Sequence, residues 1–168
     1  GELGNGSTVQ STTPVTVSSL TNVTMIDTGL YHACAVRRDG TAWCWGRNVA
    51  GETPSDDYGS GRAPAKVPGV VGAVDVAMGN TFACALIGDG TVRCWGRIIG
   101  AWPGETALPV PGIADATSIT AGEYHACARI DDGSLRCWGE NGWGQLGDGT
   151  TSVRGGAVNS ASSMRYSQ

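Results

Sequence analysis

Hydrophobic and polar residues alternate in short stretches along the whole chain, and glycine-rich turns separate these stretches. Three of the stretches are Val23 to Asp27, Ala73 to Ala77 and Ala116 to Thr120. Alternation with a period of two is typical of β-strands that bury one face. No helical period longer than one turn occurs. The pattern therefore predicts an all-β protein.

The strands recur in three copies of one unit. In each copy a glycine is followed after four residues by a cysteine, and after nine more residues by Cys-Trp-Gly. The copies run from Gly29 to Gly46, from Gly79 to Gly96 and from Gly122 to Gly139. Their first cysteines lie 50 and then 43 residues apart. Repetition at such a period indicates a repeat architecture, so the whole fold is expected to be built from this unit.

Each unit is interpreted as four short strands. One strand carries the alternation, two form a hairpin, and the fourth is an extended stretch bordered by proline, which suits a sheet edge. The extended stretches are Pro14 to Val17, Ala65 to Pro68 and Leu108 to Pro111. A glycine-rich turn also recurs, as Gly1 to Thr8 and Gly144 to Thr151.

These recurrences predict four segments. Residues 1–28 are the end of one repeat and the outer strands of the next, and residues 29–78 are a repeat with a disulfide hairpin and an acidic loop. Residues 79–121 are the second repeat, and residues 122–168 are the third repeat and the start of a following one.

The hairpin of each unit is centred on an Asp-Gly pair. Asp39 lies midway between Cys34 and Cys44, and Asp89 and Asp132 take the same place in the other copies. Symmetric pairing about one residue gives a three-residue loop, a type I turn followed by a left-handed residue. Glycine adopts that conformation without a steric penalty. This register places Cys34 directly opposite Cys44.

The register predicts one cross-strand disulfide in each hairpin. Opposed β-carbons lie about 4.5–5.5 Å apart, and strand twist can close the gap to the about 3.5–4.5 Å that a disulfide requires. Each bridge would contribute about 2–3 kcal/mol. Three bridges indicate an extracellular, periplasmic or cell-surface location, whereas six reduced core cysteines are the alternative. The predicted pairs are Cys34–Cys44, Cys84–Cys94 and Cys127–Cys137.

The composition argues against nucleic-acid and membrane partners. The formal net charge is −4, Lys66 is the only lysine, and no run of lysine or arginine forms the basic stripe that phosphate binding needs. No apolar stretch approaches the roughly 18 residues of a membrane span. No signal peptide is visible. Because Gly1 opens in the middle of a repeat, a mature, trimmed or excised chain is expected.

Two patterns that resemble ligand sites have simpler explanations, and a third leaves a weak alternative. His32 and His125 each precede a cysteine by two residues, but Phe82 takes that place in the second copy and no close cysteine pair occurs, so packed histidines are favoured over zinc. Gly142 to Gly147 spells G-x-G-x-x-G, yet a turn follows where dinucleotide binding needs a helix. Aspartates in the loop from Thr53 to Arg62 leave a weak calcium site open. No catalytic residue, metal or cofactor is predicted, and a non-enzyme is expected.

Tryptophans that recur are expected in the core, and those that do not recur are better binding candidates. Trp45, Trp95 and Trp138 recur in every copy. Two Asn-x-Ser/Thr sites, at Asn5 and Asn22, fit the glycan acceptor pattern. The candidate partner-binding residues are Trp43, Asp56, Asp57, Tyr58, Trp102 and Trp143.

The quoted residues resemble a known family. The pattern Gly-x-x-His-x-Cys-Ala, Asp-Gly-x-x-x-Cys-Trp-Gly and Asn-x-x-Gly-Gln-Leu-Gly-Asp-Gly-Thr-Thr, best seen in Tyr124 to Thr151, is similar to the regulator-of-chromosome-condensation repeat. The resemblance covers essentially the whole chain. It implies an all-β fold of about three four-stranded β-propeller blades, part of a larger or oligomer-completed propeller. The paired cysteines are similar to those of the secreted bacterial branch.

The functions that the resemblance implies are diverse, and the fold does not choose among them. We expect a non-enzymatic, secreted or cell-surface scaffold that binds a protein partner through the variable loops Thr53–Arg62, Ile98–Glu105 and Glu140–Trp143. One alternative is a structural, self-assembling extracellular protein whose repeats pack between chains, including a homo-oligomer that completes the propeller. Another is a propeller-type inhibitor of an extracellular enzyme such as a β-lactamase.

Overall fold

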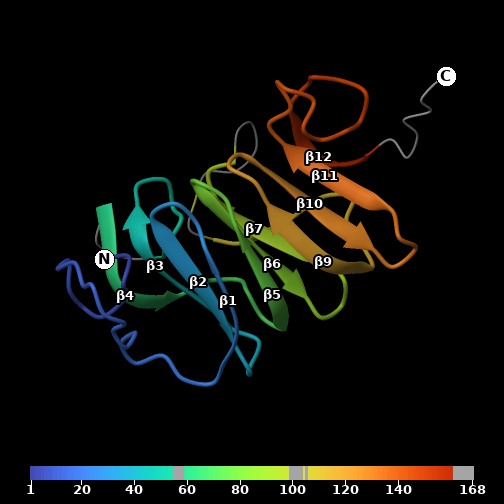
Figure 1. The fold of residues 1–168 in the computed structure, drawn as a ribbon. Helices are drawn as coiled ribbons and strands as arrows, with labels where there is room; N and C mark the ends of the chain where they lie inside the picture. Colours follow the sequence, from blue (N-terminus) through green and yellow to red (C-terminus); the bar gives the residue numbers. More distant parts are fainter. Residues whose placement is uncertain (55–58, 99–103, 105, 161–168) are drawn as a thin grey trace.

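The computed structural model describes residues 1–54, 59–98, 104 and 106–160, which form strands, turns and loops without a helix (Figure 1). The strands make three antiparallel sheets of four, each in sequence order. Blade 1 contains β1 (Val23–Thr28), β2 (His32–Arg37), β3 (Ala42–Asn48) and β4 (Gly59–Lys66). Blade 2 contains β5 (Ala73–Met78), β6 (Phe82–Ile87), β7 (Val92–Gly96) and β8 (Leu108–Pro109). Blade 3 contains β9 (Ala116–Ala121), β10 (His125–Ile130), β11 (Leu135–Gly139) and β12 (Arg154–Asn159).

The all-β architecture is therefore confirmed, with two differences in the outer strands. The stretch from Pro14 to Val17 forms no strand. A strand needs a hydrogen-bonding neighbour, whereas Val17 packs through its side chain against blade 1. The segment Gly59 to Arg62, expected in a loop, is the first half of β4 and pairs with the end of β3. No helix that could cross a membrane occurs among the described residues.

The Asp-Gly hairpins have the predicted register. Cys34 lies opposite Cys44, and the other two hairpins repeat this pairing. Gly40 has φ 76° and donates its amide to the Arg37 carbonyl at 2.9 Å. The Asp39 carboxylate accepts hydrogen bonds from the Thr41 hydroxyl and amide, and these bonds lower the pKa of Asp39. Aspartate is therefore suited to the turn because its side chain closes the loop.

All three predicted disulfides are confirmed, namely Cys34–Cys44, Cys84–Cys94 and Cys127–Cys137. The Cα atoms of the pairs are 4.1, 4.0 and 4.1 Å apart, so the opposed strand positions come close enough for a bridge. Each bridge joins the two central strands of its blade.

The glycine of each Cys-Trp-Gly is required by a close backbone approach. Gly96 has φ 79°, and a β-carbon there would lie 2.5 Å from the carbonyl oxygen of Thr81, the residue directly before the facing strand β6. Gly46 and Gly139 have φ values of 101° and 109° and face a carbonyl at the same distance. A larger residue would have to adopt a left-handed conformation and push the hairpin apart.

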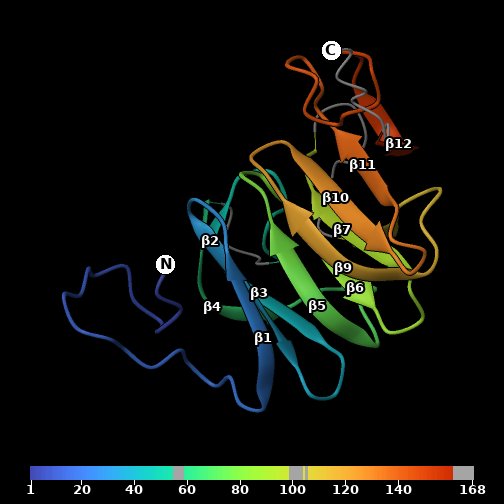
Figure 2. The same ribbon diagram turned by 45° about the vertical axis from the view of Figure 1, so that its right-hand side comes forward.

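The blades pack with unlike faces together. The disulfide face of blade 1 lies in one buried cluster with Ala83, Ala85 and Trp95 of blade 2. The disulfide face of blade 2 lies in a second cluster with Ala126, Ala128 and Trp138 of blade 3. As a result β1, β5 and β9 run side by side as the first strands of successive blades (Figure 2). The recurring tryptophans are core residues, as predicted.

A turn from the preceding part of the chain caps each of the first two core indoles. Trp45 Nε1 donates to the Glu2 carbonyl at 2.9 Å, and Trp95 Nε1 donates to the Glu52 carbonyl at 3.1 Å. Each acceptor lies 43 residues before its donor. In the described part of the chain the buried Nε1 of Trp138 has no hydrogen-bond partner.

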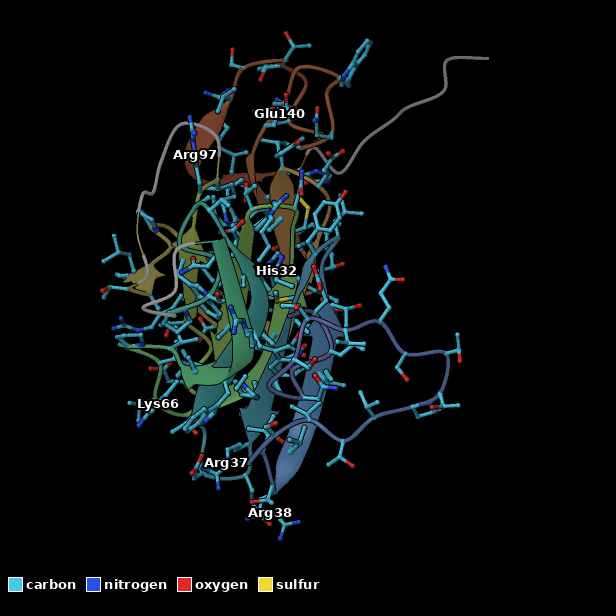
Figure 3. All side chains as sticks on the ribbon, turned by 90° about the vertical axis from the view of Figure 1, so that its left-hand side faces the viewer. His32, Arg37, Arg38, Lys66, Arg97 and Glu140 are labelled. Atoms are coloured by element: carbon cyan, nitrogen blue, oxygen red, sulfur yellow. A yellow bond between two sulfur atoms is a disulfide. The ribbon has the colours of Figure 1, made fainter. Side chains whose placement is uncertain are left out.

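The molecule has two ends that differ in their loops. Figure 3 shows Arg97 and Glu140 at one end, Arg37, Arg38 and Lys66 at the other, and His32 between them. We call the first the loop end; it contains residues 29–31, 79–81, 122–124 and 140–143 with Arg97. We call the second the hairpin end, because it carries the Asp-Gly turns.

Candidate partner-binding surface

A chain of polar side chains crosses all three blades at the loop end. Arg47 Nη2 of blade 1 donates to the carbonyl of Asn80 at 2.8 Å and to its side-chain oxygen at 3.2 Å. Asn80 Nδ2 donates to the Tyr124 hydroxyl at 2.8 Å and to Glu123 Oε1 at 3.3 Å. The Asn80 amide also donates to the Glu123 carbonyl at 2.8 Å. The loop end is therefore a connected surface and not three separate sets of loops.

A buried carboxylate holds this polar chain in place. The Glu52 side chain is fully buried, and its Oε1 accepts a hydrogen bond from Arg47 Nε at 3.1 Å. Its Oε2 accepts the amides of Val49 and Ala50 at 2.9 and 2.6 Å. A buried carboxylate is stable only when charged and polar donors surround it. Glu52 thus fixes both the guanidinium of Arg47 and the backbone that leads to the indole of Trp95.

Aromatic and aliphatic side chains extend from the loop end into solvent. Leu30 is 64% exposed and Tyr31 is 46% exposed. The guanidinium carbon of Arg47 lies 4.9 Å from the centroid of the Tyr31 ring, which is a cation–π distance. This part of the surface therefore combines apolar area with a cation whose position is fixed.

Trp143 projects from a tightly organised turn. Its side chain is 94% exposed, and its amide donates to Gln145 Oε1 at 2.9 Å. The buried Asn141 side chain accepts the Leu146 amide at 3.0 Å and donates to Asp148 at 3.1 Å. These bonds fix the backbone on both sides of the indole.

The Asp148 carboxylate closes the same turn. It accepts hydrogen bonds from the Thr150 hydroxyl at 2.7 Å and from the Thr150 amide at 2.9 Å, and it forms an ion pair with Arg154 at 3.0 Å. These contacts lower the pKa of Asp148 to about 2. The hydrogen bond from the Thr150 side chain is the main cause, and the hydrogen bonds from Arg154 and Asn141 add to it. The turn is therefore held by a charged side chain at every ordinary pH.

The predicted binding residues do not gather at one place. Trp143 lies at the loop end, whereas the partly buried Trp43 lies on β3, with its Nε1 donating to the Thr41 hydroxyl at 2.9 Å. The Arg37 guanidinium lies 5.8 Å from the Trp43 ring centroid. Asp56, Asp57, Tyr58 and Trp102 lie outside the described residues. The role of all six in binding stays a prediction.

The two histidines differ in their surroundings. His32 is 2% exposed between blades 1 and 2, and burial lowers its pKa, an effect that the nearby Glu52 carboxylate partly opposes. His125 occupies the equivalent position on the open face of blade 3 and is only partly buried. Within the described ranges no three His, Cys, Asp or Glu side chains come together as metal ligands.

Sequence reasoning missed the polar chain and the indole-capping turns. The residue that directly follows the first glycine of each repeat differs in every copy. It is Leu30, Asn80 or Glu123. That variation in an otherwise regular unit was the available signal for a surface position. The constant separation of 43 residues between Glu2 and Trp45 and between Glu52 and Trp95 was the signal for the capping turns.

Three four-stranded antiparallel blades, packed in sequence around their first strands, define a β-propeller repeat protein. The regulator of chromosome condensation (RCC1) repeat model matches residues 23–52, 73–97 and 116–145, half of the chain. The chain belongs to this repeat family.

Solved structures with similar folds agree with this assignment. Yeast RCC1 (Prp20) bound to Kap60 is 19% identical with a TM-score of 0.80, over 95% of this chain and 42% of that one. Human WBSCR16 is 16% identical with a TM-score of 0.76, over 94% of this chain and 44% of that one. The ectodomain of the Physcomitrella patens receptor kinase CR4 is 27% identical with a TM-score of 0.51, over 80% of this chain and 34% of that one.

The chain thus spans less than half the length of these structures. No individual curated protein sequence is significantly similar to it.

Proposed function

We propose that the chain is a non-enzymatic, secreted or cell-surface propeller module that binds a protein partner through its loop end, with Trp143 as the main contact. The observation that carries this proposal is the 94% exposure of Trp143 on a turn whose backbone is fixed by Asn141 and Asp148. Tryptophan is among the residues most enriched at binding hot spots. A side chain on a rigid turn loses little conformational entropy when it is buried by a partner.

Relatives support protein binding as the general activity. The yeast RCC1 structure contains Kap60, and a second structure of Prp20p from Saccharomyces cerevisiae is described together with its binding to Gsp1p and histones. Neither likeness transfers a partner, because both identities are 19%. What they support is that a propeller of this kind offers its surface to other proteins.

Two observations support an extracellular or periplasmic location. All six cysteines are paired, and such bridges persist in oxidising compartments. The receptor kinase structure with 27% identity is an ectodomain. We infer that this chain also works outside the reducing cytosol.

The test uses the intact, disulfide-bonded chain as bait for proteins of the exported fraction, followed by direct affinity measurement with each captured protein. The key variant is Trp143→Ala. Its matched control is Leu108→Ala, because Leu108 is 44% exposed on the outer strand β8. We expect a partner that binds Trp143→Ala at least about tenfold more weakly and binds the control as it binds the unchanged chain.

Both variants should melt at the temperature of the unchanged chain, since neither residue is in a buried cluster. The proposal is wrong if every directly binding protein tolerates Trp143→Ala. It is also wrong if the loss of affinity comes with an equal loss of thermal stability.

A further inference from the structure

His32 is buried in the contact between blades 1 and 2 without a hydrogen bond from its ring to any described residue. It is 2% exposed, and Nδ1 and Nε2 both lack a partner there. The nearby Phe82 carbonyl accepts the Gly79 amide at 2.9 Å instead. A neutral imidazole always carries one N–H donor, so His32 buries an unsatisfied polar group whichever nitrogen holds the proton. Such groups are rare in folded proteins.

Packing alone does not require a histidine at this place. Blade 2 carries Phe82 at the equivalent position, and Phe82 is fully buried in the cluster with blade 3. Blade 2 also carries Ala77 where blade 1 carries Asp27, since each lies opposite the first cysteine of its hairpin. The contact between blades 1 and 2 therefore has titratable groups at two positions where the contact between blades 2 and 3 has apolar ones.

Charged side chains approach His32 mainly from blade 1. Glu52 and Arg47 lie near the ring from the loop after β3 and from β3 itself, and Asp27 lies near it from β1. Burial is the main cause that lowers the pKa of His32; Arg47 adds to it, whereas Glu52 and Asp27 oppose it. From blade 2, Asp75 on β5 lies near Asp27, and burial raises the pKa of Asp75. The His32 ring is therefore neutral at neutral pH.

The two carboxylates near this histidine help to hold blade 1 against blade 2. Asp27 Oδ2 accepts the Met78 amide of blade 2 at 2.9 Å. Glu52 Oε1 accepts Arg47 Nε at 3.1 Å. The same guanidinium donates to the Asn80 carbonyl of blade 2 at 2.8 Å. The histidine therefore lies beside polar contacts that join the two blades at the loop end.

A proton on His32 would add a buried charge to this interface. An imidazolium has two N–H donors, and neither ring nitrogen has an acceptor among the described residues. Charged groups without partners are costly in a dry interface. The protonated ring is therefore favoured when the site opens to water or when the carboxylates of Asp27 and Glu52 turn toward it. Either change breaks contacts that join the blades.

We propose that the contact between blades 1 and 2 at the loop end is an acid-sensitive joint. When His32 takes up a proton, the Met78 amide separates from Asp27. The Arg47 guanidinium separates from Asn80, and the contact between blades 2 and 3 stays closed. One consequence rests on the function proposed above: a partner whose contacts include blades 1 and 2 binds more weakly in mild acid. The joint itself is tested on the chain alone, so its failure and the failure of partner binding are distinguishable.

The test is amide hydrogen exchange of the full, disulfide-bonded chain, resolved by NMR between about pH 5 and about pH 8. The opened joint takes up a proton at the ordinary histidine pKa of about 6.5, whereas the closed joint resists it. Protection of the Met78 amide, relative to the unfolded chain at the same pH, should therefore be constant above that pH and fall about tenfold for each pH unit below it. The Ala116 amide, which donates to the Gly90 carbonyl at 2.9 Å across blades 2 and 3, should keep its protection.

The variant His32→Phe copies Phe82 and should make the protection of Met78 independent of pH in this range. The matched control is His125→Phe, the same substitution at the equivalent place of blade 3, which should keep the loss of protection at Met78. Asp75 does not produce this loss, because its raised pKa favours the closed joint as the pH falls.

Three outcomes overturn the proposal. One is protection of Met78 that does not change with pH in the unchanged chain. Another is an equal loss at Met78 in the His32→Phe variant. The third is an equal loss at Ala116, because it shows that the whole chain unfolds instead. The first and third outcomes are read from the unchanged chain, so the proposal stays testable if a variant does not fold.

Discussion

Arg47 of blade 1 donates two hydrogen bonds to Asn80 of blade 2, at 2.8 Å to the carbonyl and at 3.2 Å to the side-chain oxygen. The contact joins two blades at the loop end through the Arg47 side chain, whose Nε also donates a hydrogen bond to the buried Glu52. Blade packing and the geometry of the loop-end surface are therefore coupled, and a substitution of Glu52 should alter both.

Replacing Glu52 with glutamine should destabilise the chain. The glutamine side chain has one acceptor oxygen and an NH₂ group, so at least one of the donors that Glu52 now satisfies is left facing another donor. Loss of a buried charge-assisted hydrogen bond costs about 2 kcal/mol, which urea unfolding would measure. Glu2→Gln is the control, since its side chain is 59% exposed and pairs with the terminal amine. Equal stability of the two variants would contradict the role given to Glu52.

Replacing Gly96 with alanine should be far more costly than replacing Gly88. The added methyl group at Gly96 would lie 2.5 Å from the Thr81 carbonyl and force a left-handed alanine. At Gly88 the nearest atom is a Val74 methyl at 3.4 Å, and φ is not positive. We expect a loss of about 3 kcal/mol or more at Gly96 and less than about 1 kcal/mol at Gly88. Thermal unfolding checks this, and similar melting temperatures would refute it.

His32 should make the chain less stable in mild acid. Burial lowers its pKa in the folded state, so the unfolded chain takes up a proton first as the pH falls. Protonation of His32 therefore leaves the free energy of unfolding unchanged above the unfolded pKa of about 6.5. Below that pH it decreases the free energy of unfolding. His32→Phe copies Phe82 of blade 2 and removes this proton uptake. Melting temperatures at about pH 7.5 and about pH 5.5 should differ less in the variant, and an unchanged difference would rule out His32 as the cause.

Asp148 should matter at a much lower pH. Its pKa of about 2 lies below the unfolded value, so its contribution is present above about pH 4 and disappears as the pH falls toward 2. Asp148→Asn cannot be protonated in this range. Between about pH 5 and about pH 3 the unchanged chain should lose more stability than the variant. Urea midpoints at the two pH values test this. Because Asp39, Asp89 and Asp132 are present in both proteins, the comparison isolates Asp148.

The disulfide of blade 3 should be reduced before the other two. Cys127 is partly exposed on the open face, whereas the four cysteines of blades 1 and 2 are between 0% and 1% exposed. Thiol–disulfide exchange requires access for the attacking thiolate. With limiting reductant, alkylation and mass mapping should find Cys127 and Cys137 labelled first. Simultaneous labelling of all six cysteines would mean that reduction follows global unfolding instead.

The parts of this fold that local spacing determines could be predicted from the sequence. The midpoint aspartate, the following glycine and the ten-residue cysteine separation specify the hairpin register and the bridges. The outer strands were less predictable, because β4 and β8 are defined by pairing with a neighbour and not by their own pattern.

The loop-end surface could not be predicted for a related reason. Arg47 and Asn80 lie 33 residues apart in the chain and meet only when two blades are packed. No pattern in the sequence sets Glu52 apart, because its burial depends on Arg47 and on the backbone amides of Val49 and Ala50 that surround its carboxylate. Trp143 was identified because it does not recur, and recurrence can be read directly from a sequence.

Every blade has a sulfur side and an indole side, and in both internal contacts the sulfur side of one meets the indole side of the next. The row of blades therefore has a direction, because each blade uses a different face for the blade before it and the blade after it. A duplication that adds one unit therefore supplies both faces of the new contact, because each unit carries one face of each kind. Repeat number can therefore increase by duplication without the evolution of a new type of blade interface.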